Sequence, residues 1–357
     1  MRIDDEVSGA GGRGAVAGNR GGTGRTVTSK DVARVAGVSQ STVSYVMSGK
    51  RPISARTRRI VEDAIAQLTY HPNAGARALA SQRTQIVAVV MPFDVGLGAA
   101  GLMAFIEEIT LAARARDHDV LIVTAEEGVD GLRRVAGRAL CDAVVVMEVS
   151  TDDPRAAIAR DLRVPTLFIG FPDDAAGLHC IDFDFEDGAR LLVGELAGAA
   201  RVSALVWGPD TVDRGLNYVP RFRAAAQEAA AAAGVQLDWV PLERDRVEEQ
   251  VRTVLDGGGQ ALLVTSFLSR VVHAVQEAGL RPGTDLDLVA LATDADATGF
   301  TVPLTAVSTH PRDVSRQAMS WLFDLLEQGA GPAGVRRVPA FVTRRSSVRA
   351  SPTPRVP

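Results

Sequence analysis

The residues with the clearest chemical implication lie in a short basic segment near the N-terminus. Residues 25–84 carry ten lysines and arginines against three acidic residues, a net charge of +7, whereas the whole chain carries −4. Within this segment, Ala33, Gly37 and Val43 stand at relative positions 1, 5 and 11. This pattern is typical of a helix-turn-helix. Ala33 is small where the two helices cross, Gly37 allows a positive φ in the turn, and Val43 fills the core that the helices share. The segment therefore predicts binding to a polyanion, double-stranded DNA.

Two short helices must position these residues. Thr28 is a predicted N-cap with Asp31 three residues later, a variant of the capping box, and Gly37 ends the first helix. Ser39 is predicted to cap the second helix. The residues expected on the inward side of that second helix are Val43, Val46 and Met47.

A third helix completes the small domain. It is expected to begin after a cap at Ser54 and to run to about Tyr70, where His71-Pro72 ends it, because a residue before proline avoids the α region. An alanine-rich stretch, residues 74–81, follows as a short marginal helix. The expected apolar face of the third helix consists of Ile60, Val61, Ala64, Ile65 and Leu68.

Two motifs carry a resemblance to a known family. Residues 32–44 read V-A-x-x-A-G-V-S-x-x-T-V-S, and residues 70–79 read Y-x-P-N-x-x-A-R-x-L. With them, Thr28–Leu79 resembles the headpiece of the lactose/galactose repressor family of transcription regulators. The match continues more loosely to about Ser347. The resemblance implies a regulator, by default a repressor, that binds a palindromic operator as a homodimer.

The resemblance also implies roles for single residues. The second helix would enter the major groove, with its N-terminal residues at the base edges. The residues expected to read bases are Gln40, Ser41 and Tyr45, and those expected to contact the DNA backbone are Thr28, Ser39, Thr42 and Ser44. Family members commonly have an arginine at the place of Tyr45, so the family's usual half-site is put in doubt here.

Residues 73–84 resemble the family's hinge helix and linker. In that family the hinge folds on DNA and inserts a leucine into the central base step of the minor groove. Leu79 falls on this position, and Arg77 is expected along the minor groove.

The rest of the chain alternates apolar strands with amphipathic helices, which indicates parallel sheets covered on both faces. Two consecutive series, the second beginning at His179–Phe183, predict two doubly wound subdomains that resemble periplasmic sugar-binding proteins. The fold class expected is thus a small all-α headpiece plus an α/β periplasmic-binding-protein-like body. The predicted boundaries are a disordered tail at 1–24, the headpiece at 25–72, the hinge and linker at 73–84, the body at 85–348 and a frayed end at 349–357. Within the body, the N-subdomain is expected at about 85–170 and 308–330, and the C-subdomain at 171–307 and 331–348.

Such a body takes a small-molecule effector in the cleft at the carboxyl ends of its strands. The cleft residues expected are Phe93, Asp94, Asp184, Trp207, Tyr218, Arg221, Ser266, Phe267 and Asp294. Tyr218 stands where sugar-binding members of the family carry an arginine, and Thr265-Ser266-Phe267 replaces their Asn-Asp pair. Because a polyol needs carboxylates and bidentate donors at its hydroxyls, the effector is a sugar, a less polar metabolite, or absent.

One competing class is a nicotinamide-dependent oxidoreductase. Residues 96–101 fit the pattern G-x-G-x-x-G between a strand and a helix, but Pro92–Val95 separate the glycines from the strand they should follow. The five histidines are scattered, without metal-ligand spacing or a nucleophile motif. No cofactor, metal or enzymatic activity is therefore expected.

The N-terminal residues and the lengths of the apolar runs indicate where in the cell the protein is expected. Met1–Asp5 is acidic and no apolar h-region follows it, and no apolar run reaches the length of a membrane span. The expected location is the cytoplasm, with no membrane partner. The two cysteines, Cys141 and Cys180, lie outside any C-x-x-C pattern and are expected to be small buried residues.

Overall fold

The computed structural model describes residues 27–48, 51–70, 83–91, 99–329 and 331–349. The chain divides into two compact units, residues 1–80 and 81–357, and each is described by itself. Among the described residues, no helix combines the length and apolar character needed to cross a membrane.

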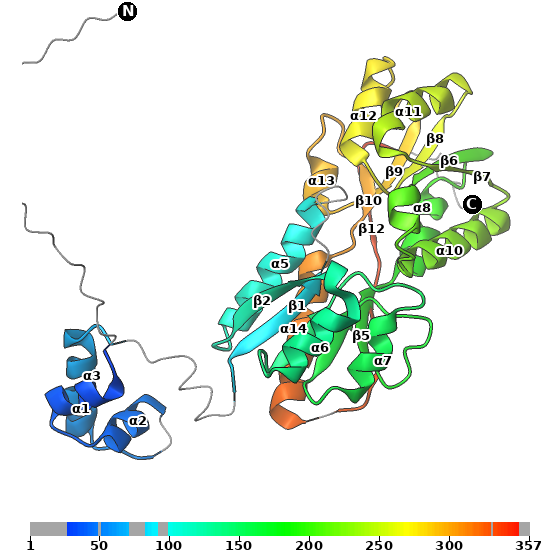
Figure 1. The fold of residues 1–357 in the computed structure, drawn as a ribbon. Coiled ribbons are helices and arrows are strands. Elements are labelled where there is room, and N and C mark those ends of the chain that lie inside the picture. Colours follow the sequence, from blue (N-terminus) through cyan, green and yellow to red (C-terminus); the bar gives the residue numbers. More distant parts are fainter. Residues whose placement is uncertain (1–26, 49–50, 71–82, 92–98, 330, 350–357) are drawn as a thin grey trace, which may run out of the picture. The chain divides into compact units, whose positions relative to one another are not determined.

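The first unit contains three helices, α1 (Ser29–Ala36), α2 (Gln40–Ser48) and α3 (Ala55–Gln67) (Figure 1). The predicted start and stop signals are confirmed. The backbone amide of Thr28 donates to the Asp31 carboxylate at 3.0 Å, and Gly37 has the left-handed φ of 63°. The α2 cap is Ser39 and the α3 cap is Ser54; each hydroxyl accepts from the backbone amide three residues on, at 3.1 Å. The buried side chains that hold the three helices together are Val32, Ala33, Ala36, Val43, Val46, Val61, Ala64 and Tyr70.

Three details of this unit differ from the prediction. Met47 and Ile60, expected inside, lie on the outside, with 37% and 40% of their surface exposed. The helix α3 ends at Gln67 instead of Tyr70. The chain leaves it through Thr69 at a φ of 48°, and this turn lets the Tyr70 ring close the end of the core.

Gly37 supplies a test of the turn. Its φ of 63° is costly for residues with a Cβ, yet nothing lies within 4 Å of the place where a Cβ would stand. Gly37→Val is therefore expected to destabilise the first unit by backbone strain alone, by about 1–2 kcal/mol. Gly37→Asn, which tolerates this conformation, should cost clearly less. Thermal unfolding of the two variants beside the parent checks this, and equal losses would contradict the strain argument.

The second unit contains two six-stranded sheets. The first, parallel throughout, has the order β11 (Gly334–Val338), β5 (His179–Phe183), β4 (Thr166–Ile169), β3 (Ala143–Val146), β1 (Ile86–Met91) and β2 (Asp119–Thr124). The second has the order β12 (Val342–Thr343), β10 (Thr305–Val307), β9 (Asp287–Leu291), β8 (Ala261–Val264), β6 (Arg201–Val206) and β7 (Gln236–Pro241). Its strands are parallel except for the antiparallel pair of β10 and β12.

Helices cover the sheets, as the buried central strands require. They are α5 (Ala99–Arg114), α6 (Gly128–Gly137), α7 (Pro154–Asp161), α8 (Phe185–Glu195), α9 (Pro209–Val212), α10 (Tyr218–Ala233), α11 (Val247–Asp256), α12 (Leu268–Glu277), α13 (Asp294–Thr298) and α14 (Pro311–Gln328), with short 3₁₀ turns at Ala125–Glu127 and Arg244–Arg246. The long helix α14 packs against α5, β4 and β5 in the first subdomain, while α8 pairs with α10 and α11 with α12 in the second (Figure 1).

Two strands belong to a different sheet from the one expected. β5 was expected to open the second series, but it lies in the first sheet, paired in parallel with β4 on one side and β11 on the other. β11 therefore also belongs to the first sheet. The placement of residues 171–183 and 334–338 in the C-subdomain is thus wrong. No helix connects β4 to β5, so the strand–helix alternation that guides a sequence-based division is interrupted at this point. The chain crosses between the subdomains next to Asp184, at 308–310 and at 339–341.

Candidate functional site

The outward face of α2 is set by what the helix buries. Val43 and Val46 face the core, so Gln40, Ser41 and Ser44 are exposed on the opposite side. Tyr45 is half-buried, with the Arg51 guanidinium 5.0 Å from its ring centroid. The side chains predicted to read bases therefore share the accessible side of one helix.

Hydroxyl groups gather at the N-terminus of α2. The Ser39 hydroxyl lies 2.8 Å from those of Ser41 and Thr42. The Gln40 side-chain amide donates to Ser29 at 2.8 Å, which ties the start of α2 to α1. A helix N-terminus with its unpaired amides attracts anions such as phosphate. Thr28, by contrast, donates its hydroxyl to Asp31 at 2.7 Å and so serves the cap of α1.

Four of the predicted site residues fall outside the described residues. These are Arg77 and Leu79 of the hinge and Phe93 and Asp94 of the cleft. Gly96 and Gly98 of the G-x-G-x-x-G pattern also lie outside.

The second unit holds a cavity of about 240 Å³ where the carboxyl ends of strands from both sheets meet. Its polar lining consists of Glu148, Asp182, Arg214, Asn217, Tyr218, Thr265 and Thr309. The other aromatic side chains that line it are Phe105, Phe171, Phe183, Phe185 and Trp207.

Aromatic rings form one wall of the cavity. Tyr218 stacks on Phe185 with a centroid distance of 4.7 Å and an interplanar angle of 16°, and Trp207 meets Tyr218 edge-on at 5.2 Å. Burial raises the pKa of Tyr218 well above its usual range, so its phenol stays neutral. A planar ligand would find stacking partners here.

Two ion pairs flank the aromatic wall and join the subdomains. Arg214, before α10, donates to Glu148, after β3, at 2.7 Å. Arg221 of α10 donates to Asp182 of β5 at 2.6 Å, and its guanidinium lies 3.8 Å from the Phe171 ring centroid. Both carboxylates are therefore neutralised within the protein.

Three buried polar atoms in cavity-lining residues have no hydrogen-bond partner among the described residues. They are Nε of Arg214, Oδ1 of Asn217 and Oγ1 of Thr265. Asn217 is 2% exposed, and its Nδ2 already donates to Asp173 at 2.9 Å. Since buried polar groups normally find partners, each of these atoms has a hydrogen-bonding position that the described residues do not fill.

The residues predicted from sequence divide in two. Trp207 and Tyr218 line the cavity, and Arg221 supports it through Asp182. Asp184 instead caps α8, accepting from the Asp187 amide at 3.0 Å. Ser266 is outside the lining, next to Thr265, which belongs to it.

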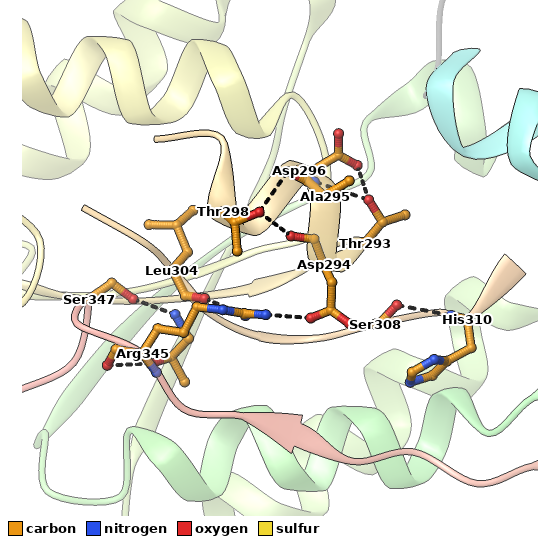
Figure 2. Close-up of polar contacts among 11 residues, drawn as sticks. Thr293, Asp294, Ala295, Asp296, Thr298, Leu304, Ser308, His310, Arg345 and Ser347 are labelled. Carbon is orange, nitrogen blue, oxygen red and sulfur yellow. Dashed lines mark hydrogen bonds and ion pairs between the residues drawn. The ribbon is translucent and has the colours of Figure 1, made fainter. Parts of the chain in front are cut away.

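Phe267 and Asp294 also have other surroundings. Phe267 packs against the core beneath α11 and α12. Asp294 is paired with Arg345, which also donates to the carbonyl of Leu304 at 2.9 Å; Figure 2 shows this network around α13. The Asp294 carboxylate is thereby committed to a contact between α13 and the C-terminal segment.

Sequence reasoning left Glu148, Asn217 and Phe171 out of the site. Glu148 and Phe171 follow β3 and β4 at the carboxyl edge of the first sheet, which is where ligand-binding residues of parallel sheets gather. The strand ends were therefore a usable signal. Asn217 lies in a turn before α10, and nothing in the local sequence marks it.

Asp182 makes stability depend on pH. Burial raises its pKa from 3.8 to about 6 despite the opposing Arg221. Between these values the folded state holds a proton that the unfolded state has released. Stability is therefore lost as pH rises through this window, by up to about 3 kcal/mol. In Asp182→Asn this contribution should vanish, and denaturant unfolding at several pH values measures it. Parallel pH profiles for parent and variant would contradict the assignment.

Sequence comparisons place the chain among bacterial regulators. Residues 28–73 match the family described as "Bacterial regulatory proteins, lacI family", and residues 197–348 match the "Periplasmic binding protein-like domain". The HTH-type transcriptional regulator AglR of Rhizobium meliloti (strain 1021) is 30% identical over 86% of this chain and 90% of that protein. The lactose operon repressor of Escherichia coli (strain K12) is 28% identical over 92% of each.

Solved structures agree on the architecture. The lac repressor dimer bound to operator and the anti-inducer ONPF superposes with a TM-score of 0.77 at 25% identity, over 91% of this chain and 100% of that one. The transcriptional regulator CelR–cellobiose complex shares the fold, with a TM-score of 0.60 at 23% identity over 90% and 99%.

Proposed function

Since the chain belongs to the LacI family of bacterial regulatory proteins, we propose that it is a transcriptional repressor that binds a palindromic operator as a homodimer. The observation that carries this is the turn between α1 and α2. Gly37 at a φ of 63° joins the helices while Ala33 and Val43 are buried between them. This arrangement presents Gln40, Ser41 and Ser44 together on the accessible side of α2.

The contacts with DNA follow from this face. The N-terminus of α2, with the hydroxyls of Ser39 and Thr42, would sit on phosphates and fix the register. Gln40 and Tyr45 would reach base edges in the major groove, with Ser41 beside them. Ser44 and Thr28 are proposed as further backbone contacts, and Arg77 and Leu79 as minor-groove contacts. One headpiece makes too few contacts for specific affinity, which favours two half-sites read by two copies.

The cavity of the second unit is the proposed effector site. Its ligand would touch both subdomains, which the backbone bonds from Thr151 to Gly215 (2.8 Å) and from Asn217 to Val149 (3.1 Å) already connect. Two relatives support the idea: solved structures hold the lac repressor with an anti-inducer and CelR with cellobiose. If the two arrangements of the subdomains differ in DNA affinity, a ligand that binds one of them more tightly shifts the population toward it. The change in DNA affinity is limited by the difference between the ligand's binding free energies for the two arrangements.

The named relatives are transcriptional regulators. We accordingly propose that this chain is a regulator without catalytic activity, and that it works in the cytoplasm, where operator DNA is available. The G-x-G-x-x-G pattern at 96–101 gains no support from the relatives named above.

Selection of bound DNA from a random pool tests the proposal. The expected result is enrichment of one palindrome, with half-sites about one helical turn apart. The double variant Gln40→Ala/Ser41→Ala should lose this enrichment, while Glu62→Gln, a change on the exposed face of α3, should keep it. A pool that yields no palindrome with the parent protein would refute the dimeric operator.

A further inference from the structure

The chemistry of the cavity indicates the class of its ligand. One wall is the aromatic group formed by Phe185, Tyr218 and Trp207. The guanidinium of Arg221 covers one face of the Phe171 ring, 3.8 Å from its centroid. Stacked and edge-on rings offer a flat ligand a matched surface. A cavity of about 150 Å³ is enough for benzene, so the 240 Å³ here has room for a ring with substituents.

Within the part of the chain that the structure describes, each carboxylate of the cavity lining is paired with an arginine. Glu148 is paired with Arg214, and Asp182 is paired with Arg221. A charged ligand would leave one member of these pairs, or itself, uncompensated in a partly buried site. The lining therefore favours a neutral ligand.

The unpartnered polar atoms of the lining favour particular hydrogen-bonding groups on the ligand. Nε of Arg214 can only donate, so it calls for an acceptor, whereas Oδ1 of Asn217 can only accept and calls for a donor. The Thr265 hydroxyl can do either. Two or three hydrogen-bonding groups on an otherwise apolar molecule satisfy these three atoms.

We infer that the effector of this protein is a neutral, planar hydroxylated aromatic compound and not a sugar. This inference rests on the proposed function for the consequence of binding, but the binding itself can be measured without DNA. Tyr218 is the residue that determines specificity. Its ring supplies the stacking surface at the place where the family resemblance predicts an arginine for polyol hydroxyls.

Calorimetric titration of the full chain at neutral pH tests the inference with a matched pair of probes. Methyl 4-hydroxybenzoate is neutral, carries a hydroxyl donor and an ester acceptor, and is expected to bind. The anion 4-hydroxybenzoate has the same ring and hydroxyl but a full charge, and should bind about tenfold more weakly or not at all. D-Glucose, D-galactose and cellobiose should bind more weakly than the ester.

Three variants separate stacking from folding. Tyr218→Leu removes the ring and should weaken binding of the ester about tenfold, whereas Tyr218→Phe keeps the ring and should retain most of the affinity. Trp239→Phe changes an aromatic residue of β7 outside the cavity lining and should have no effect. Thermal unfolding confirms that each variant folds.

The outcomes decide between the alternatives. Tighter binding of any of the three sugars than of the ester, no binding of the ester, or equal affinities for the ester in the parent and Tyr218→Leu would overturn the inference. Adding the ester to the protein on its selected operator separates this from the proposed function. If the ester binds without changing operator affinity, the inference about the ligand stands and control of DNA binding by this effector is refuted. If a sugar releases the operator instead, effector control stands and the inference about the ligand is refuted.

Discussion

Replacing Arg221 with alanine is expected to cost the second unit about 3–5 kcal/mol of unfolding free energy. The side chains of Arg221 and Asp182 are only 13% and 11% exposed, so the change leaves a buried carboxylate without its partner. It also removes the guanidinium from the Phe171 ring. Urea unfolding at neutral pH, followed by circular dichroism, measures the loss.

A matched control distinguishes burial from the mere loss of an arginine. Arg344 pairs with Glu195 at 2.9 Å, but its side chain is 78% exposed, so Arg344→Ala should leave the unfolding free energy nearly unchanged. The Arg221→Ala loss should also shrink at acidic pH, because protonation of Asp182 then removes the unpaired charge. Equal losses in the two alanine variants would show that the Arg221–Asp182 pair does not behave as a buried one.

Gln40→Ala is expected to weaken binding to the selected operator by about 1–3 kcal/mol per half-site, at least tenfold for the dimer. A glutamine side chain can bond adenine at two atoms, and alanine can make neither bond. Nonspecific binding depends on phosphate contacts and should stay within about twofold. Fluorescence anisotropy with operator and with random DNA, at one fixed salt concentration, gives both values.

Gln67→Ala is the matched control, because it removes an exposed glutamine from the end of α3. It should leave both affinities unchanged. If Gln40→Ala lowers binding to operator and to random DNA by the same factor, Gln40 contacts the backbone or shapes the helix and does not read a base.

Local chemistry made the headpiece predictable. The caps at Thr28, Ser39 and Ser54 and the turn at Gly37 depend on residues within three or four positions, so the sequence alone contains the whole interaction. The exposure of Met47 depends instead on how the helices of the unit pack together, and its spacing along α2 does not reveal that.

Long-range pairing limited the prediction of the body. Whether β5 joins the first or second sheet depends on its partners β4 and β11, and β11 lies about 150 residues later. The candidate site shows the same effect. Asp294 follows a strand as a ligand-binding residue should, but Arg345, 51 residues on, takes its carboxylate. Tyr218 and Trp207 lie in the cavity lining, at positions that follow from the strand and helix boundaries near them.

The chain passes back and forth between the two sheets, and this determines when each part of the protein can finish folding during synthesis. The first sheet begins with β1 at residue 86 but lacks its edge strand until β11, at residues 334–338, has left the ribosome. The cavity likewise lacks Val314 of α14 until late. The three-helix unit, whose described contacts lie within residues 27–70, has no such delay. During translation, the headpiece proposed to bind DNA is therefore complete long before the cavity proposed to bind an effector.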